Sequence, residues 1–525
     1  MVFRNERTWQ TAVEAGRQEE FHAAYDAAVA KVRAEFGRKQ PIYIDGKAVW
    51  SKGGTFDDTS PADRTLVLGH FQKGTRADAR KAVAVAKAGF PEWSRTPFLE
   101  RARLMQRAAD LMSGRKFYLA ALMTFENGKN RFESVADVDE AIDFLRWYAE
   151  ALIANRGFER EMGRYHPNEH AIGVLRPFGV WAVVSPFNFP LAIATGMTVG
   201  ALITGNTAVL KPASDTPFMA LKLYETLREA GVPGSAIQYV TGPGSTVGQE
   251  LVENEDVAGF AFTGSKAVGL GAFRRFSESH PKPMIAEMGG KNPTIVTATA
   301  DLEKAVAGVM RAAFGYGGQK CSATSRVIVD KRIKRQFLSR LVEETKRIRV
   351  GDPTQRDVFL GPVINEDAVG KFRLAVQIAK RGRGNVVCGG NVLATGAFKK
   401  GLFVEPTIVD GLPPNHRINQ EEWFVPILGV IECDGLEDAL EIANGVEYGL
   451  TAGIFSEDPE DVRQFFDRIE AGVAYANRAS GATTGAVVGV QPFGGWKAST
   501  VTNKSAGGDY YLQQFLREQS RTTYS

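Results

Sequence analysis

Cysteine is scarce in this chain, and its scarcity excludes a fold held together by disulfides. The 525 residues include three cysteines, Cys321, Cys388 and Cys433. An odd and low count in so long a chain suits a reducing compartment, so we expect a cytoplasmic protein. The N-terminus, MVFRNER, is polar and charged, which is untypical of a secretory signal.

An excess of charge of one sign and a long apolar run are also missing. Lys plus Arg number 64 and Asp plus Glu number 60, a net charge of +4, so a nucleic-acid partner has no electrostatic support. The most apolar stretch, 190–205, contains several threonines and glycines and is too short to cross a bilayer. We therefore expect no membrane partner and assign this stretch to a buried helix or loop.

Two series of alternating strands and helices occupy the chain after residue 180. Short apolar runs predict strands at 181–184, 207–210, 237–240 and 258–262, with helices at 217–230 and 245–253. A second series begins near 293, with strands at 294–297 and 326–329 and helices at 301–314 and 332–347. Such alternation is typical of parallel sheets covered by helices, so we predict two α/β domains facing each other across a cleft.

The N-terminal part has a different pattern. Apolar residues recur at helical spacing from Phe21, and further helical patterns cover 76–92, 97–112, 115–127 and 134–153. One hairpin is predicted at 42–49, where Asp45-Gly46 separates two β-prone runs. We therefore expect this part to be helical with a single hairpin.

Cys321 is the candidate nucleophile. Three glycines in the seven residues before it break the helix and let backbone approach a ligand closely. The preceding Lys320 is expected to favour the thiolate, which is the reactive form. The alternative, a small buried apolar residue, is our interpretation of Cys388 and Cys433.

Two further side chains are candidates for chemistry. Glu287 follows a short apolar run and precedes Gly-Gly, where a strand ends and the chain turns. Its alternative is a solvated surface glutamate. Asn188 lies between two phenylalanines and two prolines, where its amide could donate to a developing oxyanion or stabilise an Asx turn.

Glycine-rich turns suggest phosphate binding, whereas the histidines do not suggest a metal. Segments 241–248 and 262–266 each join a strand to a helix and could aim N–H groups at an anion, or be tight connections only. His166 and His170 have helical ligand spacing, but Pro167 and the lack of a third ligand favour a loop. We predict no metal site.

Seven segments together resemble the aldehyde dehydrogenase superfamily, and they occur in the order found there. The resemblance covers about residues 40–515. The segments are SPFNFP (185–190), KPA (211–213), FTGS (262–265), EMGGKNP (287–293), GQKC (318–321), EEWFVP (421–426) and PFGG (492–495).

The resemblance implies a fold with two α/β domains and a small β element for oligomerisation. The Rossmann-like nucleotide-binding domain would comprise 1–154 and 178–289, and the catalytic domain 290–503. Residues 155–177 and 504–525 would form the oligomerisation element, so we expect a homo-oligomer.

The resemblance also implies a mechanism and its residues. The Cys321 thiolate would attack an aldehyde, Asn188 would stabilise the oxyanion, and Glu287 would activate the water that hydrolyses the thioester. NAD is the implied cofactor, with NADP also accepted. The implied cofactor contacts are Ser185, Pro186, Phe187, Lys211, Ser214, Gly244, Gly248, Phe262, Thr263, Gly264, Ser265, Glu422 and Phe424.

Within the superfamily the chain is most similar to the members that oxidise glutamate γ-semialdehyde, in equilibrium with 1-pyrroline-5-carboxylate, to glutamate in proline breakdown. The similarity lies in the N-terminal extension, in Lys320-Cys321-Ser322 and in segment 484–491. It implies a substrate aldehyde that carries a carboxylate. The implied substrate contacts are Phe189, Ser322, Gly485, Ala486 and Phe493.

Four departures from the superfamily pattern leave alternatives open. Ser214 replaces a glutamate frequent in NAD-preferring members, and Val425 replaces a glycine. The loop 479–483 is longer than the usual loop before the carboxylate anchor, and Ala498-Ser499-Thr500 replaces the usual ending of a small residue and glycine after Lys497. The alternatives are another carboxylated semialdehyde such as succinate semialdehyde, or a non-catalytic scaffold with the same fold.

Overall fold

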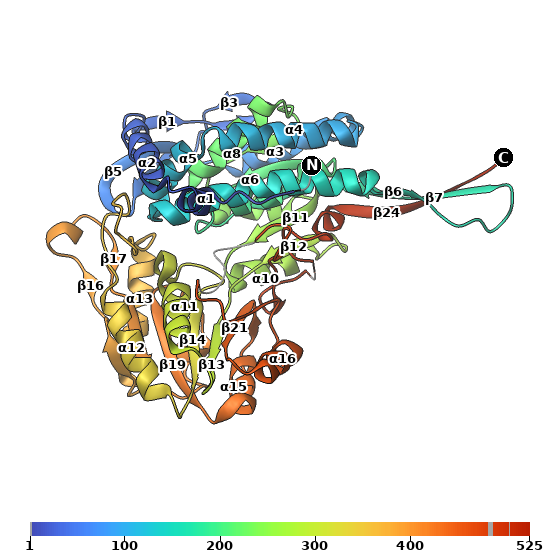
Figure 1. Ribbon diagram of the computed structural model, residues 1–525. Coiled ribbons are helices and arrows are strands. Elements are labelled where there is room, and N and C mark those ends of the chain that lie inside the picture. Colours follow the sequence, from blue (N-terminus) through green and yellow to red (C-terminus); the bar gives the residue numbers. More distant parts are fainter. Residues whose placement is uncertain (1–2, 481–486, 503) are drawn as a thin grey trace.

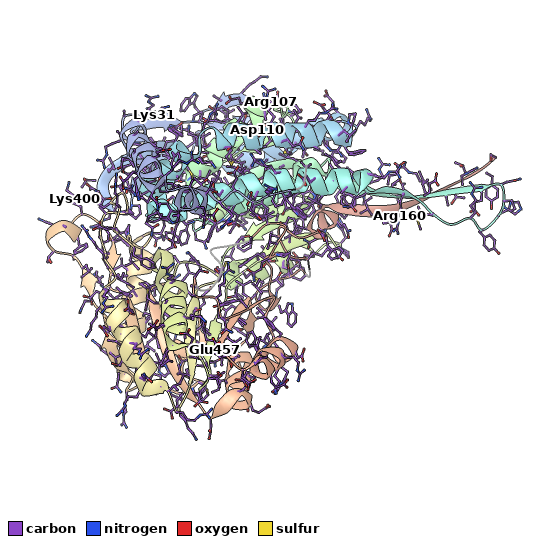
Figure 2. All side chains as sticks on the ribbon, in the orientation of Figure 1. Lys31, Arg107, Asp110, Arg160, Lys400 and Glu457 are labelled. Carbon is purple, nitrogen blue, oxygen red and sulfur yellow. The ribbon has the colours of Figure 1, made fainter. Side chains whose placement is uncertain are left out.

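Two α/β bodies make up most of the molecule, and a thin β arm extends from one of them (Figure 1). This computed structural model describes residues 3–480, 487–502 and 504–525. The body coloured blue to green contains the chain up to Glu287, and the yellow to orange body contains most of the chain from 292 to 476. Charged side chains such as Arg107, Lys400 and Glu457 lie on the outside of the molecule (Figure 2).

The first body contains a seven-stranded sheet in the order β12-β11-β8-β9-β10-β2-β3. The strands from β12 to β10 are parallel, whereas β2 and β3 form an antiparallel hairpin beside β10. The chain runs from β8 outward to β10 and then returns to the other side of β8, so the strand order reverses between β8 and β11. Ligands of open α/β sheets bind outside the carboxyl ends of the strands at such a point. The bounds are β2 Ile42–Ile44, β3 Lys47–Val49, β8 Val180–Val184, β9 Thr207–Lys211, β10 Ile237–Tyr239, β11 Val257–Thr263 and β12 Met284–Glu287.

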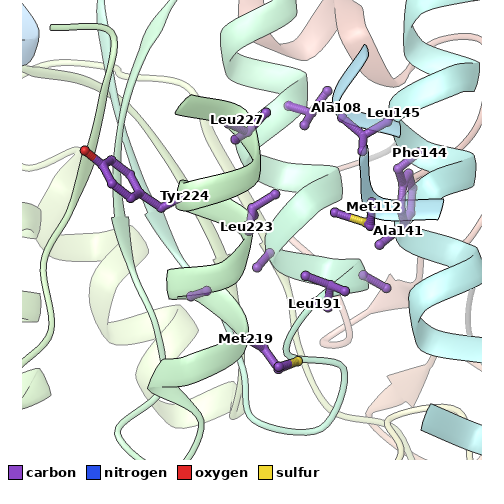
Figure 3. Packing of buried hydrophobic residues seen from close by; sticks show 14 of the residues in the cluster. Ala108, Met112, Ala141, Phe144, Leu145, Leu191, Met219, Leu223, Tyr224 and Leu227 are labelled. Carbon is purple, nitrogen blue, oxygen red and sulfur yellow. The ribbon is translucent and has the colours of Figure 1, made fainter. Parts of the chain in front are cut away.

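Helices cover both faces of this sheet because its central strands carry apolar side chains on both faces. In β8, Val180 and Ala182 belong to one apolar cluster, and Trp181 and Val183 belong to another. The first cluster is completed by α3 (Arg76–Trp93), α9 (Gln249–Glu253) and α10 (Lys266–Phe276). The second is shown in part in Figure 3 and includes α2 (Gln18–Arg33), α4 (Phe98–Ser113), α5 (Lys116–Asn127), α6 (Arg131–Ala154), α7 (Ala192–Ile203) and α8 (Pro217–Ala230).

Local sequence signals set the ends of several of these helices. Thr75 and Asp78 form a capping box at the start of α3. The Asn130 side chain accepts from two N–H groups at the start of α6. Gly231, with φ of 110°, ends α8 in a conformation that glycine adopts without strain. These helices, and the Asp45-Gly46 hairpin with both residues at positive φ, confirm the predicted elements.

The second body contains another seven-stranded sheet, in the order β15-β18-β19-β14-β13-β21-β22. All its neighbouring strands are parallel except β15 with β18. Helices α11 (Leu302–Phe314) and α12 (Lys334–Lys346) cover one face, α15 (Gly435–Asn444) and α16 (Pro459–Arg468) the other, and α13 (Glu366–Arg381) packs near β18. The bounds are β13 Asn292–Val296, β14 Thr324–Asp330, β15 Asn385–Cys388, β18 Thr407–Asp410, β19 Ile427–Cys433, β21 Thr451–Phe455 and β22 Val473–Ala476. The two predicted α/β series are therefore confirmed.

A three-stranded sheet near the N-terminus was not predicted. Strand β5 (Asp63–Gln72) lies between β1 (Arg38–Gln40) and β4 (Thr55–Ser60). The expectation of a single hairpin in this part was wrong because TFDDTS and much of β5 are polar or exposed. Neither strand alternates apolar and polar residues along its whole length, which is the pattern by which a sequence reveals a strand.

The arm is a three-stranded antiparallel sheet that joins distant parts of the chain. Strand β7 (Glu169–Pro177) pairs with β6 (Glu159–Glu161) on one side and with the C-terminal β24 (Leu516–Tyr524) on the other. It projects from the first body (Figure 1). Across the described ranges, no helix combines the length and apolarity needed to cross a membrane.

Candidate active site

The candidate active site lies where the two bodies meet. Glu287 ends β12 at the carboxyl edge of the first sheet, whereas Cys321 comes just before β14 at the amino edge of the second. Both side chains line one cavity, whose wall is otherwise mainly apolar. The apolar residues on that wall are Phe144, Phe189, Ile193, Met197, Ile285, Phe493 and Ala506. Two groups separated by 34 positions in sequence thus line the same mainly apolar cavity.

The loop that carries Cys321 is fixed by close backbone contacts and by one amide. Gly317 and Gly318 have φ of 62° and 65°, and a Cβ on Gly318 would lie 2.7 Å from the Val425 carbonyl oxygen. Asn292 Nδ2 donates to the carbonyl oxygens of Cys321 at 2.6 Å and of Ala323 at 2.9 Å. Gly318 is therefore needed for the close approach of this loop to the Val425 backbone, and the predicted close approach to a ligand stays a prediction.

The surroundings of Cys321 favour the thiol. Burial raises its pKa to about 12, and the nearby carboxyl groups of Glu422 and Glu287 add to that shift. Lys320 does not offset it, because its Nζ lies 2.5 Å from Glu133 Oε1 on α6. The expectation that Lys320 favours the thiolate is therefore not supported by its position.

Glu287 is held by a segment more than two hundred residues away. Its Oε1 accepts from the Thr500 hydroxyl at 3.0 Å. Burial raises the pKa of Glu287 to about 8, opposed by hydrogen bonds from the Thr500 hydroxyl and the Gly495 N–H. A carboxyl group poised near neutrality can both take and return a proton.

Asn188 lies in the turn between β8 and α7 and is buried. The next residue, Phe189, lines the cavity of Cys321. The Lys129 ammonium group lies 3.7 Å from the centroid of the Phe189 ring and forms a buried ion pair with Asp137. Asp137 also accepts from the Ala192 N–H at 2.8 Å. The buried Lys129–Asp137 ion pair therefore stabilises the β8–α7 turn that carries Asn188.

The predicted contacts for the adenine half of a nucleotide gather at the carboxyl edge of the first sheet. Lys211 ends β9, and a Cβ on Gly248 would lie 3.8 Å from its Cε, so the two residues are neighbours. Burial lowers the pKa of Lys211 to about 8. Ser214 is exposed three residues further on, and Gly244 begins the turn that leads to Gly248.

The strand-to-helix turn after β11 supplies the other half of this edge. Thr263 ends β11 and also lines the cavity of Cys321. Gly264 follows, and the exposed Ser265 stands at the N-cap of α10. The free N–H groups of a helix start attract phosphate oxygens. Phe262 points instead into the apolar core beneath this turn.

A second group of predicted cofactor residues faces this edge from the other body. Glu422 Oε1 accepts from the Gly290 N–H at 2.9 Å, and burial raises the pKa of Glu422 to about 7. Phe424 contacts Phe187 of the β8–α7 turn, with ring centroids 5.8 Å apart. Ser185 and Pro186 begin the same turn and are buried.

The predicted substrate contacts are brought together in part. Phe189, Ser322 and Phe493 line the cavity with Cys321. Gly485 and Ala486 lie outside the residues that the structure describes.

Comparisons with known proteins agree with this geometry. Residues 49–520 match the aldehyde dehydrogenase family. The chain belongs to the aldehyde dehydrogenase family. It is 39% identical over 529 aligned positions to a 1-pyrroline-5-carboxylate dehydrogenase of Geobacillus sp. (strain WCH70), covering 99% of this chain and 98% of that protein.

Solved aldehyde dehydrogenases have the same fold. A Thermus 1-pyrroline-5-carboxylate dehydrogenase with bound NAD is 38% identical, with a TM-score of 0.94 and coverage of 100% of this chain and 99% of that one. A betaine aldehyde dehydrogenase of Staphylococcus aureus, in complex with NAD⁺, is 28% identical, with a TM-score of 0.88 and coverage of 94% and 96%.

Three residues of this aldehyde dehydrogenase were missed by sequence reasoning. Asn292 fixes the Cys321 loop, Thr500 bonds to Glu287, and Glu140 lines the cavity. Glu140 had a detectable signal: with Glu133 and Asp137 it forms an acidic i, i+4, i+7 series on a helix that is otherwise largely apolar. Asn292 and Thr500 act through long-range contacts, for which one sequence offers no local signal.

Proposed function

We propose that this aldehyde dehydrogenase uses NAD to oxidise glutamate γ-semialdehyde to glutamate. The observation that carries the proposal is the single cavity shared by Cys321, Glu287 and the acidic Glu140, together with the full-length similarity to 1-pyrroline-5-carboxylate dehydrogenases. The other candidate, a non-catalytic scaffold, does not explain why a thiol and a carboxyl group line the same mainly apolar cavity.

The carboxyl edge of the first sheet suits NAD. Lys211 is proposed to contact the adenosine ribose, the Ser265 hydroxyl at the N-cap of α10 the pyrophosphate, and the Glu422 carboxyl group the nicotinamide ribose hydroxyls. When bound, NAD supplies the two-electron oxidation that turns the Cys321 adduct into a thioester.

The chain's own residues carry the other steps. Cys321 releases its proton to solvent and its sulfur bonds to the aldehyde carbon, and Asn188 donates a hydrogen bond to the oxyanion that forms from the carbonyl oxygen. After oxidation, Glu287 takes a proton from water, and the water oxygen bonds to the thioester carbon. The carbon–sulfur bond then breaks, glutamate leaves, and the proton returns to Cys321.

The Glu140 carboxyl group on the cavity wall suits an aldehyde substrate that carries an ammonium group. Glutamate γ-semialdehyde carries a carboxylate and an ammonium group. Ser322 with the N–H groups at Gly485 and Ala486 is proposed to bind the carboxylate. Glu140 on the α6 wall is proposed to attract the ammonium group. Succinate semialdehyde lacks that ammonium group and gains nothing from Glu140.

The test is NADH formation at 340 nm with a panel of aldehydes. We expect kcat/KM for glutamate γ-semialdehyde to exceed that for succinate semialdehyde by at least about tenfold, a difference of about 1.4 kcal/mol. Glu140→Gln should narrow that ratio, and Cys321→Ala should abolish turnover while NAD binding persists. Equal use of both semialdehydes would contradict the substrate proposal, and turnover by Cys321→Ala would contradict the mechanism.

We also propose a domain organisation in which each part of the chain has its own function. Residues 1–154 and 178–289 bind the nucleotide, 290–503 carry the nucleophile, and 155–177 with 504–525 mediate homo-oligomerisation. The projecting β6–β7–β24 sheet supports the last point, since its strand edges and the exposed Met162 and Tyr165 suit contact with a second copy.

A further inference from the structure

Thr500 is directly opposite Glu287 in a short antiparallel pairing at the end of β12. The Met288 N–H donates to the Ser499 carbonyl at 2.7 Å, and the Val501 N–H donates to the Ala286 carbonyl at 3.1 Å. These bonds flank the Glu287–Thr500 bridge. Glu287 and Thr500 are therefore a non-hydrogen-bonded pair, the type whose side chains lie closest together.

The Thr500 hydroxyl has two acceptors for its one proton. Thr500 Oγ1 lies 3.0 Å from Glu287 Oε1 and 3.2 Å from the Thr502 carbonyl oxygen, and it accepts from the Thr502 N–H at 3.0 Å. When Glu287 is ionised, the hydroxyl can donate to the carboxylate. When Glu287 is protonated, the hydroxyl can turn toward Thr502 and accept from the acid. One side chain thus serves both protonation states of the base.

Glu287 also stands between two cavities. The first contains Cys321, and the second is a polar hollow of about 310 Å³ that Thr500 lines. Among the residues that the structure describes, Glu287 alone lines both. The second hollow has room for several water molecules, since one water needs only about 10–15 Å³ of such volume.

We propose that Thr500 is a positioning residue for the hydrolytic half of the reaction. Its hydroxyl keeps the Glu287 carboxyl group at the boundary between the two cavities, both before and after Glu287 takes a proton from water. Hydrolysis of the thioester therefore depends on Thr500, whereas formation of the thioester does not. This proposal rests on the proposed role of Glu287 as general base.

The test is rapid-mixing measurement of NADH formation by Thr500→Val, a variant of similar shape without the hydroxyl. We expect an initial NADH burst of wild-type amplitude, followed by a steady-state rate about ten- to a hundredfold lower, as fits the loss of a hydrogen bond to a charged group. The pH midpoint of the steady-state rate should move upward, because the carboxylate loses a donor. Thr500→Ser should restore both rate and midpoint.

Two further variants keep the outcomes distinct. Ser505 also lines the polar hollow, and we expect Ser505→Ala to keep the wild-type steady-state rate and pH midpoint. If Thr500→Val does not fold, Thr500→Ala provides the same comparison against Thr500→Ser. A wild-type rate and pH midpoint in the hydroxyl-free variant would overturn the proposal, even where Glu287→Gln stalls after a burst. A Glu287→Gln enzyme that turns over normally would instead overturn the role of Glu287 itself.

Discussion

Cys321 and Glu287 share a cavity that favours the neutral form of both groups. Burial raises the pKa of Cys321 to about 12 and that of Glu287 to about 8. Both shifts disfavour the charged forms of these groups, the thiolate and the carboxylate. Cys321 must lose its proton before it attacks the aldehyde, and Glu287 must lose its proton before it activates water. We therefore expect the activity of this enzyme to rise with pH.

Replacing Glu287 by Gln should separate the two half-reactions. Acylation of Cys321 survives, so we expect a burst of NADH followed by a steady-state rate lower by about 10²-fold or more, in the range of general-base contributions. In the wild type the steady-state rate should rise with pH through about 8, where the carboxylate forms. Stopped-flow absorbance from pH 6 to 9.5 measures both effects. A variant without a burst and with wild-type turnover would assign the base to another residue.

Replacing Ser214 by Glu should shift the enzyme toward NAD. Serine at position 214 carries no negative charge to repel a 2′-phosphate, and burial raises the pKa of the nearby Asp215 carboxyl group, so we expect the wild type to use NADP as well as NAD. A new carboxylate should lower kcat/KM for NADP by about tenfold or more relative to NAD, since repulsion at partial exposure is worth about 1–4 kcal/mol. Ser214→Gln is the uncharged control of similar size. An unchanged NAD/NADP ratio in Ser214→Glu would show that residue 214 does not face the ribose.

At the scale of elements, helix α6 contacts several parts of the candidate active site. Glu133, Asp137 and Glu140 lie on one side of it, and they reach Lys320, Lys129 and the substrate cavity respectively. Asp137 has two partners, since it pairs with Lys129 at 2.6 Å and accepts from the N–H that starts α7. The helix therefore connects the Cys321 loop with the turn that carries Asn188.

Removing Asp137 should destabilise the protein and slow catalysis together. Neither Asp137 nor Lys129 exposes any of its side chain, so Asp137→Ala leaves a buried charge unpaired, at a cost of about 3–5 kcal/mol. Loss of the bond to the Ala192 N–H should also loosen the Asn188 turn and lower kcat. Thermal unfolding and steady-state kinetics measure the two effects. The double variant Lys129→Met with Asp137→Leu should recover most of the stability. A single variant within about 1 kcal/mol of wild type would show that the pair is not needed.

For the whole molecule, a buried carboxyl pair couples stability to pH. Asp58 of β4 is buried close to Glu126 of α5, which accepts from the Phe218 and Met219 N–H groups at the start of α8. Burial raises the pKa of Glu126 to about 8 and that of Asp58 well above its usual range. Each folded-state pKa exceeds the unfolded one, so their contribution to stability is complete at low pH and is lost as pH rises through about 8.

Asp58→Asn should flatten this dependence on pH. The asparagine amide donates to Glu126 without titrating, so Tm should fall less between pH 7 and 9 than in the wild type. Each pKa unit removed is worth about 1.4 kcal/mol. Asp57→Asn, on the same strand but exposed, is the matched control and should follow the wild type. Equal slopes of Tm against pH in Asp58→Asn and the wild type would contradict a shared buried proton.

The elements that sequence predicted well are those with a strong local pattern. Helices α3 to α6 repeat apolar residues at helical spacing, and β8 to β11 are short apolar runs, so both were identified within a few residues. Strands β4 and β5 were missed because β4 is mostly polar and the apolar residues of β5 do not alternate regularly with polar ones. The pairing of β24 with β7 followed only from resemblance, because no local pattern specifies a partner more than three hundred residues away.

The amino-acid sequence by itself determined the reaction class of this protein. The proposed catalytic residues Cys321, Glu287 and Asn188 each stand in a short contiguous motif, so they can be proposed without coordinates. Only the tertiary structure decided what state those groups are in and what holds them. Lys320 pairs with Glu133, Thr500 bonds to Glu287, and Asn292 fixes the Cys321 loop. A side chain is buried and paired by residues far from it in the chain, whereas a motif contains only residues that are adjacent in sequence.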